Sequence, residues 1–277
     1  MTGGTITAAA DLVRSKIGIA VVGALRRKGD DDALELWPAD LHPNEAFRLV
    51  LDPGWRSADV VLELGSFAGP MLRSIANASA EAKLTFHAFI GAMRTDGLQV
   101  RFALNGVEIG PESTWPAEIG SLAIVVRQRA IVFDRSSDAD ILGLVDRLMI
   151  PVFGMLTSLI GVEEIDFETE GLSEGKPYQT LLTRYERKRV NREACLRVHG
   201  PVCAACGFEF GRFYGPVGQD FIEVHHVESL ADIGEEHPID PAKDLVPLCS
   251  NCHAMAHRQR PAYSVGQLKG MISGSGK

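Results

Sequence analysis

Residues 244–257 read DLVPLCSNCHAMAH, and this stretch decides how the last third of the chain folds. Two residues separate Cys249 from Cys252, and three separate His253 from His257. A cysteine pair with this spacing can bind a metal from a tight turn. Histidines at positions i and i+4 lie on one face of a helix. The stretch therefore predicts a metal-binding turn that leads directly into a helix.

A second cysteine pair, Cys203 and Cys206, has the same spacing, and 42 residues lie between the two pairs. Two such pairs complete a tetrahedral four-cysteine zinc site, so we expect Cys203, Cys206, Cys249 and Cys252 to hold one structural Zn²⁺. Disulfides are the weaker alternative in the reducing cytoplasm. The fifth cysteine, Cys195, is expected to pack within a helix.

Four histidines remain outside that shell, because four thiolates already fill a tetrahedral site. The segment FIEVHH (221–226) has the pattern of a strand, in which neighbouring side chains point to opposite faces. One of His225 and His226 can therefore join His253 and His257 at a second metal, while the other acts beside it. Packing in a core would explain any one of these histidines, but it explains the set of four poorly.

These segments together resemble the HNH (ββα-metal) nuclease motif in its zinc-stabilised form. The resemblance rests on FIEVHHVESL (221–230), on IDPAKDLVPLCSNCHAMAHR (239–258), on the cysteine-pair segment from Cys203 and on Tyr185-Glu186-Arg187. It covers about residues 178–262, and these residues are especially similar to bacterial HNH proteins of the modification-dependent restriction type. It implies little about residues 1–170.

The resemblance assigns a role to each matching residue. It implies that His226 is the general base, while His225, His253 and His257 bind a catalytic divalent ion. Asp244 takes the place of the asparagine that orients the base. An aspartate there departs from the family pattern, although a carboxylate can also accept from an imidazole N–H. Three imidazoles suit Zn²⁺, Ni²⁺, Co²⁺ or Mn²⁺ better than Mg²⁺, which prefers oxygen ligands.

Charge is distributed unevenly along the 277 residues, whose formal net charge is -8. Residues 1–178 carry 16 basic and 25 acidic side chains, whereas residues 179–277 carry 12 and 11. The overall balance excludes a protein that coats nucleic acid indiscriminately. Beside a nuclease motif, the basic run at 184–192 predicts contacts with DNA phosphates. The predicted contacts are Arg184, Arg187, Lys188, Arg189, Arg192, Arg258 and Arg260.

The fold class predicted is α+β, with an N-terminal α+β domain at 1–170, a linker at 171–180 and an HNH domain at 181–277. In the first domain we expect helices at Ala8–Arg27, Pro70–Met93 and Asp138–Ile160. The expected strands are Asp59–Leu64, Leu98–Leu104, Ser121–Phe133 and Glu164–Glu170, with a hairpin turn at Asn105-Gly106. His42 and His87 are isolated and are expected to have structural roles, at the surface or in the core. The sequence of this domain therefore predicts no catalytic or binding site.

The sequence thus predicts a metal-dependent endonuclease that cuts duplex DNA, with restriction of foreign or modified DNA as its role. A non-catalytic zinc module that binds nucleic acid and a nuclease toxin remain open as alternatives. A homodimer would allow both strands to be cut. No secretory signal is recognisable, and the most apolar run, Leu148–Val162, is short and contains Pro151. We therefore expect a cytoplasmic protein with no membrane partner.

Overall fold

The computed structural model describes residues 1–28, 31–41, 44, 46–110, 113–160, 184–227, 238–259 and 261–274. The chain divides into two compact units, Met1–Val190 and Asn191–Lys277. Both helices and strands are present, so the predicted α+β class is confirmed. The division falls within helix α6 (Arg184–His199), whereas the predicted linker at 171–180 lies outside the described residues. The domain limits at 170 and 181 therefore stay a prediction.

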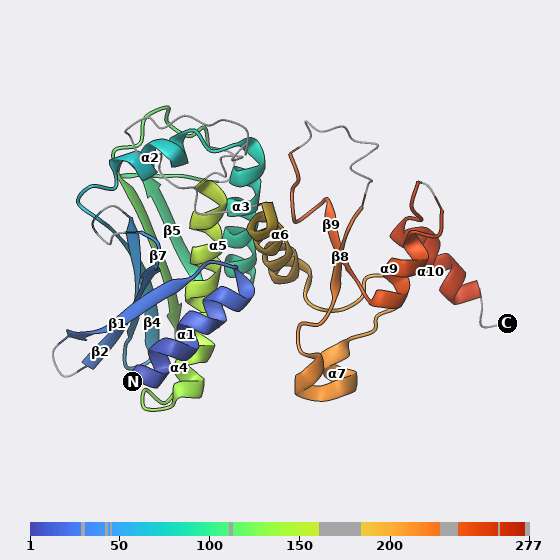
Figure 1. Ribbon diagram of the computed structural model, residues 1–277, viewed down its shortest axis with the longest axis horizontal. Coiled ribbons are helices and arrows are strands. Elements are labelled where there is room, and N and C mark those ends of the chain that lie inside the picture. Colours follow the sequence, from blue (N-terminus) through green and yellow to red (C-terminus); the bar gives the residue numbers. More distant parts are fainter. Residues whose placement is uncertain are drawn as a thin grey trace, which may run out of the picture. The chain divides into compact units, whose positions relative to one another are not determined.

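The N-terminal unit is built on an antiparallel sheet of seven strands in the order β1-β2-β3-β4-β7-β5-β6 (Figure 1). Its strands are β1 (Val21–Lys28), β2 (Asp31–Pro38), β3 (Phe47–Pro53), β4 (Ser57–Leu64), β5 (Gln99–Leu104), β6 (Val107–Glu108) and β7 (Leu122–Arg129). Asn105 and Gly106 both have positive φ, as a two-residue type I′ hairpin requires. The predicted turn and the predicted strands at 59–64 and 98–104 are confirmed.

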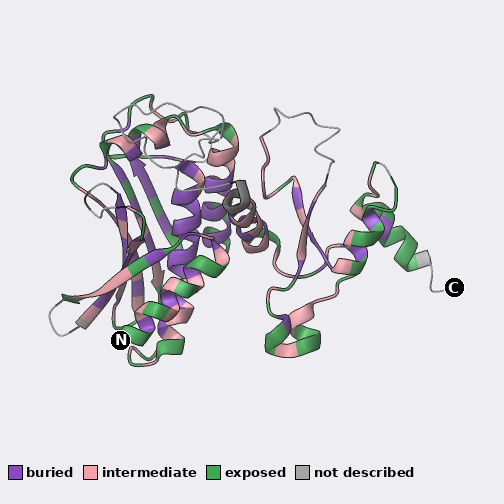
Figure 2. Ribbon diagram, viewed as in Figure 1, coloured by how far each residue is buried: buried purple, intermediate pink, exposed green. Residues whose placement is uncertain are grey.

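Helices lie along one face of this sheet (Figure 1). They are α1 (Gly3–Lys16), α2 (Gly69–Ala76), α3 (Ala80–Thr95), α4 (Asp138–Leu144), the π-helical turn η1 (Val145–Met149) and α5 (Ile150–Leu159). The core between the layers is apolar, and α5 is buried along nearly its whole length (Figure 2). Gly154 of α5 and Phe89 of α3 pack so closely that a Cβ atom on Gly154 would lie 2.3 Å from the ring.

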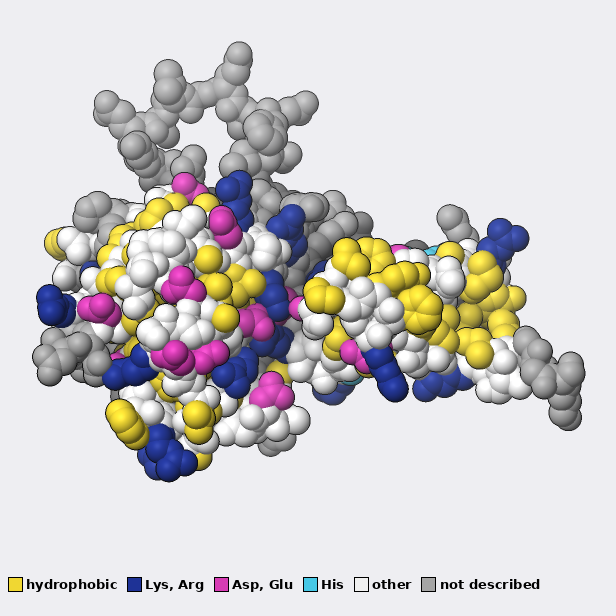
Figure 3. All heavy atoms as spheres, turned by 90° about the horizontal axis from the view of Figure 1, so that it is seen from below, with side chains coloured by type: hydrophobic (Ala, Val, Ile, Leu, Met, Phe, Trp, Pro, Cys, Tyr) yellow, Lys and Arg dark blue, Asp and Glu magenta, His cyan; other side chains and the backbone are white. Residues whose placement is uncertain are grey.

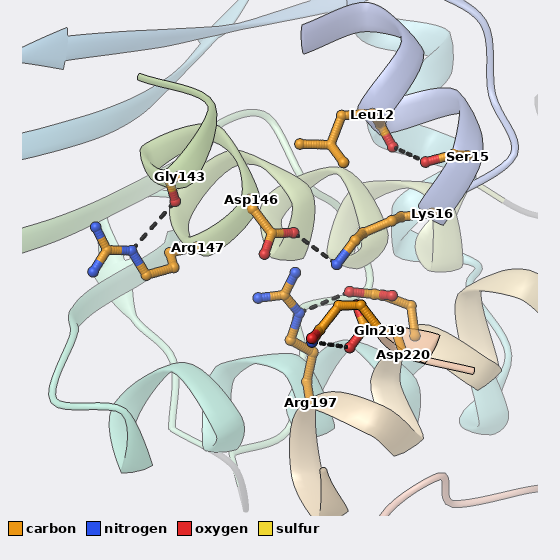
Figure 4. A network of polar contacts seen from close by, with 10 residues as sticks. Leu12, Ser15, Lys16, Gly143, Asp146, Arg147, Arg197, Gln219 and Asp220 are labelled. Atoms are coloured by element: carbon orange, nitrogen blue, oxygen red, sulfur yellow. Dashed lines mark hydrogen bonds and ion pairs between the residues drawn. The ribbon is translucent and has the colours of Figure 1, made fainter. Parts of the chain in front are cut away.

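Asp138–Leu159 is one continuous helix, as predicted, and within the described residues it alone is long and apolar enough to cross a membrane. Of its most apolar 18-residue window, 72% is buried inside the protein, as is usual for the core helix of a globular domain. The π-helical turn ends two residues before Pro151, whose nitrogen has no hydrogen to donate. Lys16 of α1 binds Asp146 of this turn at 2.9 Å, which ties two helices together (Figure 4).

The predicted helix at Ala8–Arg27 is wrong in its second half. Helix α1 ends at Lys16, Gly18 adopts a φ of 99°, and strand β1 begins at Val21. Gly23 then runs so close to β2 that a Cβ would lie 2.5 Å from the Glu35 carbonyl oxygen. The apolar residues here have a helical pattern, but pairing of β1 with β2 outweighs it. Strands β2 and β3 are both absent from the sequence prediction.

Three smaller differences concern element limits. The predicted helix at Pro70–Met93 is two helices, because the chain breaks after Ala76 and Ser79 caps the next helix. The strand predicted at Ser121–Phe133 ends at Arg129, and Ala130 follows with a φ of 57°. The strand predicted at Glu164–Glu170 lies outside the described residues, as does His42. His87 is half-buried in an aromatic cluster, and burial, with the charge of Arg94, lowers its pKa.

The C-terminal unit is smaller and is organised around one hairpin and one short helix. After α6 come α7 (Phe210–Tyr214), the 3₁₀ turn η2 (Gly215–Gly218), β8 (Glu223–His226), β9 (Leu245–Leu248), α9 (Ser250–Ala256) and α10 (Val265–Gly274). Strands β8 and β9 pair antiparallel, and α9 follows β9 directly. The aromatic segment at 207–218 contains α7 and η2.

Candidate metal centres

Four cysteine side chains converge where β9 meets α9. The ligand atoms of Cys203, Cys206, Cys249 and Cys252 all lie within 4.8 Å of one another. The first pair occupies a tight turn in which the Gly207 N–H donates to the Cys203 carbonyl at 2.8 Å, and Gly207 has a φ of 73°. The Ala204 N–H donates to the Pro247 carbonyl at 2.9 Å, which attaches this turn to β9.

The spacing of the sulfur atoms fits a tetrahedral zinc ion. Four sulfurs placed about 2.3 Å from a central Zn²⁺ lie about 3.8 Å apart. The Sγ atoms of Cys206 and Cys249 are 3.7 Å apart. Burial opposes ionisation of Cys203, but hydrogen bonds from the backbone of Cys206, Cys249 and Ala205 lower its pKa to about 7. Burial and the neighbouring thiols instead raise the pKa values of Cys206 and Cys252, so the fit to a structural zinc rests on the geometry of the cluster.

Cys195 does not belong to this cluster. It is fully buried in α6, and burial raises its pKa to about 12. A buried thiol of this kind acts as a small apolar side chain. Its position agrees with the expectation that it packs within a helix.

Three histidines form a second cluster. The ligand atoms of His225, His253 and His257 also lie within 4.8 Å of one another. Their ring centroids are 4.8–5.2 Å apart, and each pair of rings is nearly perpendicular. Strand β8 supplies the first ligand, while α9 and its C-cap residue supply the other two. The predicted i, i+4 pair and the predicted strand histidine thus meet, at a site distinct from the cysteines.

The environment of His225 keeps its imidazole neutral. Its side chain is buried, and burial, together with the charges of His253, His257 and His226, lowers its pKa to about 4. A histidine binds a metal in its neutral form, because a protonated ring nitrogen has no lone pair to donate. This donor set therefore fits a divalent ion, whose coordination shell three imidazoles would fill only in part.

Glu223 is a member of this site that the sequence prediction lacks. Its Oε2 lies 2.6 Å from Nδ1 of His253. An Nδ1–H that donates to a carboxylate leaves Nε2 to bind a metal, so this contact fixes the tautomer and the orientation of the ring. The signal was present in the sequence, because Glu223 and His225 are two residues apart on one strand and so share a face.

His226 lies beside the histidine cluster without joining it. The ladder pairs His225 with Val246 and His226 with Leu245, and strand alternation points the two side chains in opposite directions. Asp244 precedes β9, and its carbonyl accepts from the Val227 N–H at 2.8 Å. Its carboxylate accepts from the Asp240 N–H, also at 2.8 Å, which closes the turn before β9. Asp244 is therefore held next to the segment that carries His226.

The predicted DNA contacts differ in their surroundings, since some are exposed and others bind backbone carbonyls. Arg258 is exposed just after α9. In α6, Arg192 donates to the carbonyls of Asp220 and Ile222 at 2.8 and 3.1 Å, and so anchors the approach to β8. Arg189 donates to the Arg14 carbonyl at 3.2 Å. Arg184, Arg187 and Lys188 lie on the same helix, but their side chains are outside the described part of the structure. Arg260 is outside the described residues altogether.

Comparison with known proteins identifies one segment of the chain. Residues 203–259 match the family model described as HNH endonuclease. The match begins at Cys203 and includes both clusters and the hairpin between them. No curated protein and no solved structure matches the chain.

Proposed function

From the HNH endonuclease domain at residues 203–259 we infer that the chain is a metal-dependent endonuclease that hydrolyses phosphodiester bonds of duplex DNA. The observation that supports this most strongly is the convergence of His225, His253 and His257 beside the strand that carries His226. A module that only binds nucleic acid needs the cysteine site for stability, but it has no use for a second cluster of three imidazoles.

His226 is the general base of this proposal. Phosphodiester hydrolysis needs a water molecule that loses a proton as it attacks, and an imidazole titrates near the pH of the cell. His226 is half-buried and projects away from its neighbour His225, so it lies outside the set of metal ligands. Asp244, held at the adjacent turn, is the positioning residue that orients this ring through its carboxylate.

The second cluster provides the binding site for the catalytic divalent ion, with His225, His253 and His257 as its protein ligands. When bound, such an ion neutralises charge on the phosphate and its leaving oxygen. Neutral imidazoles preserve the full charge of the ion. They favour Mn²⁺, Co²⁺, Ni²⁺ or Zn²⁺ over Mg²⁺. Glu223 holds the His253 ring in the orientation that this role requires.

The basic residues of α6 are the proposed phosphate contacts, since sequence-independent binding of DNA depends on lysine and arginine. Restriction of foreign or base-modified DNA in the cytoplasm is the biological role that we propose for this activity. Side-by-side digestion of DNA from methylating and non-methylating hosts tests the substrate directly. Equal cutting of both would remove the dependence on modification.

The decisive experiment is nicking of a supercoiled plasmid with Mn²⁺, Ni²⁺ or Mg²⁺ added to metal-free enzyme. We expect His226→Ala to lower the cleavage rate by roughly 10²–10⁴-fold, the usual contribution of a general base. His199→Ala is the matched control, because His199 is an exposed histidine on α6 outside both clusters.

Unchanged cutting by His226→Ala would remove the assignment of the base. Binding of DNA without cutting, with every metal and substrate, would instead identify a non-catalytic module.

A further inference from the structure

The C-terminal unit exposes a continuous apolar surface that the proposed chemistry does not use. Figure 3 shows hydrophobic side chains gathered over α7 and towards α10. Six of them are between 46% and 69% exposed, namely Phe213, Tyr214, Phe221, Met255, Met271 and Ile272. Isolated apolar side chains are normal on a protein surface, but a connected group of this size marks an interaction site.

Ring contacts connect this apolar surface around a hollow of about 670 Å³. Tyr214, Met255, Met271 and Ile272 line the hollow directly, together with Phe208 and Phe210. Phe213 lies 4.7 Å from the ring of Tyr214, and Phe221 lies 4.8 Å from that of Phe210. The surface therefore combines a depression with aromatic side chains that project beside it.

Helix α9 separates this surface from the histidine cluster. His253 and His257 point towards β8, whereas Met255 and Arg258 line the hollow. Met255 is two residues from both His253 and His257, which places it about 200° away around the helix axis, on the opposite face. A molecule bound in the hollow would leave the metal ligands accessible to DNA.

We propose that the occupant is a second copy of this chain, in a two-fold symmetric dimer in which Phe213 and the end of α10 of each copy enter the hollow of the other. Two-fold contacts use the same patch on both partners, and therefore need a depression and a projection on one surface. This surface provides both.

The area fits such a contact. Taking roughly 150–250 Å² for a whole aromatic side chain, the six exposed residues present roughly 600 Å² of apolar surface. A standard interface buries about 800 Å² per partner, including a polar rim. The apolar group is therefore large enough to be the centre of a stable dimer interface.

The chemistry of the surface favours protein over DNA. Apart from Cys206, Cys249 and Cys252 of the predicted zinc site, Arg258 is the one charged side chain among the described residues that line the hollow, and the rest are aromatic, aliphatic or small polar, with two methionines. Aromatic residues, methionine and arginine are enriched at protein interfaces, while lysine and acidic residues are depleted. A surface that binds the phosphate backbone would need several cations.

The consequence for cleavage rests on the proposed function. One HNH unit carries one proposed base and one proposed metal site, and so cuts one strand at a time. A dimer brings two such sites to one duplex. We therefore expect the dimer to convert supercoiled plasmid to linear DNA, and a monomer to stop at the nicked circle.

Sedimentation equilibrium of the full chain tests the dimer without reference to activity. We expect the wild type to sediment as a dimer, and Phe213→Glu and Ile272→Glu to shift the equilibrium to monomer. Both side chains are about half exposed or more, so the charge changes the contact and not the core. Val132→Glu is the matched control, because Val132 is 92% exposed in the N-terminal unit. A wild-type monomer at every concentration, or dimers in both variants, would overturn the proposal.

Plasmid cleavage by the same proteins separates the two hypotheses. A dimer that cuts no DNA would contradict the proposed function and leave the interface standing. Nicking and linearisation at equal rates in wild type and monomeric variants would show that the dimer has no part in cutting. We expect Ile272→Glu to nick normally while linear product falls at least tenfold.

Discussion

At the scale of single residues, the contact between Glu223 and His253 is the feature with the clearest chemical consequence. Carboxylates that orient a ligand histidine typically contribute 10–100-fold to metal affinity. We expect Glu223→Ala to weaken Mn²⁺ or Zn²⁺ binding at the histidine cluster by this factor, measured by titration calorimetry on protein that retains its structural zinc. Glu223→Gln, which can still accept from the imidazole N–H, should recover part of the loss.

The control for this prediction is Glu108→Gln, at an exposed position on β6. Its metal affinity should equal that of the wild type. If Glu223→Ala bound metal normally, or lost affinity only in proportion to a loss of folding stability, Glu223 would not be a positioning residue.

At this scale, the sequence predicts which residues share a metal site best where the ligands are close together along the chain. The spacing of Cys203/Cys206, Cys249/Cys252 and His253/His257 is local, and the structure brings each set together as expected. The contribution of Asp244 is harder to read, because its carboxylate closes a turn through the Asp240 N–H. Its proximity to His226 depends on pairing across the hairpin, which no local pattern specifies.

At the scale of elements, the packing of α3 against α5 depends on one glycine. A Cβ on Gly154 would lie 2.3 Å from the buried ring of Phe89, so the two helices would have to separate. Overpacking of this kind typically costs about 1–3 kcal/mol. We expect Gly154→Ala to lower the free energy of unfolding of the N-terminal unit by this amount, measured by urea denaturation.

Gly91 in α3 provides the opposite case on the neighbouring helix. It is exposed, and a Cβ atom added to it would meet no other atom within 4 Å. Alanine is favoured over glycine in a helix by about 1 kcal/mol, so Gly91→Ala should stabilise the protein. A similar effect of both substitutions would contradict the close contact between α3 and α5.

The strands that the sequence prediction missed form through contacts between residues that are far apart in the chain. Strands β1, β2 and β3 pair with one another, and the apolar residues of Ala8–Arg27 suit a helix as well as they suit the observed helix and strand. Short strands at 59–64 and 98–104 were predictable because they alternate and are bounded by turn residues. The sheet order, with β7 between β4 and β5, could not be obtained from local sequence.

At the scale of the whole molecule, the two units differ in what stabilises them. The N-terminal unit has a large apolar core between its sheet and helices. In the described part of the C-terminal unit, eight buried residues form the core cluster, and three of them belong to the predicted zinc site, Cys203, Cys249 and Cys252. A core of this size stabilises a domain poorly without a metal or another cross-link.

Zinc removal should therefore unfold one unit and spare the other. Structural zinc contributes on the order of 10–16 kcal/mol to the folding of small zinc domains, far more than the apolar core of this unit can replace. We expect a strong chelator, or Cys252→Ser, to abolish protection from hydrogen exchange in β8, β9 and α9 while the strands of the large sheet stay protected. His257→Ala is the control, since it removes a ligand of the other cluster and should leave that protection intact. Retained protection throughout the C-terminal unit after zinc is removed would mean that the cysteines do not stabilise its fold. Loss of protection in both units would mean that the N-terminal core does not fold independently of the metal.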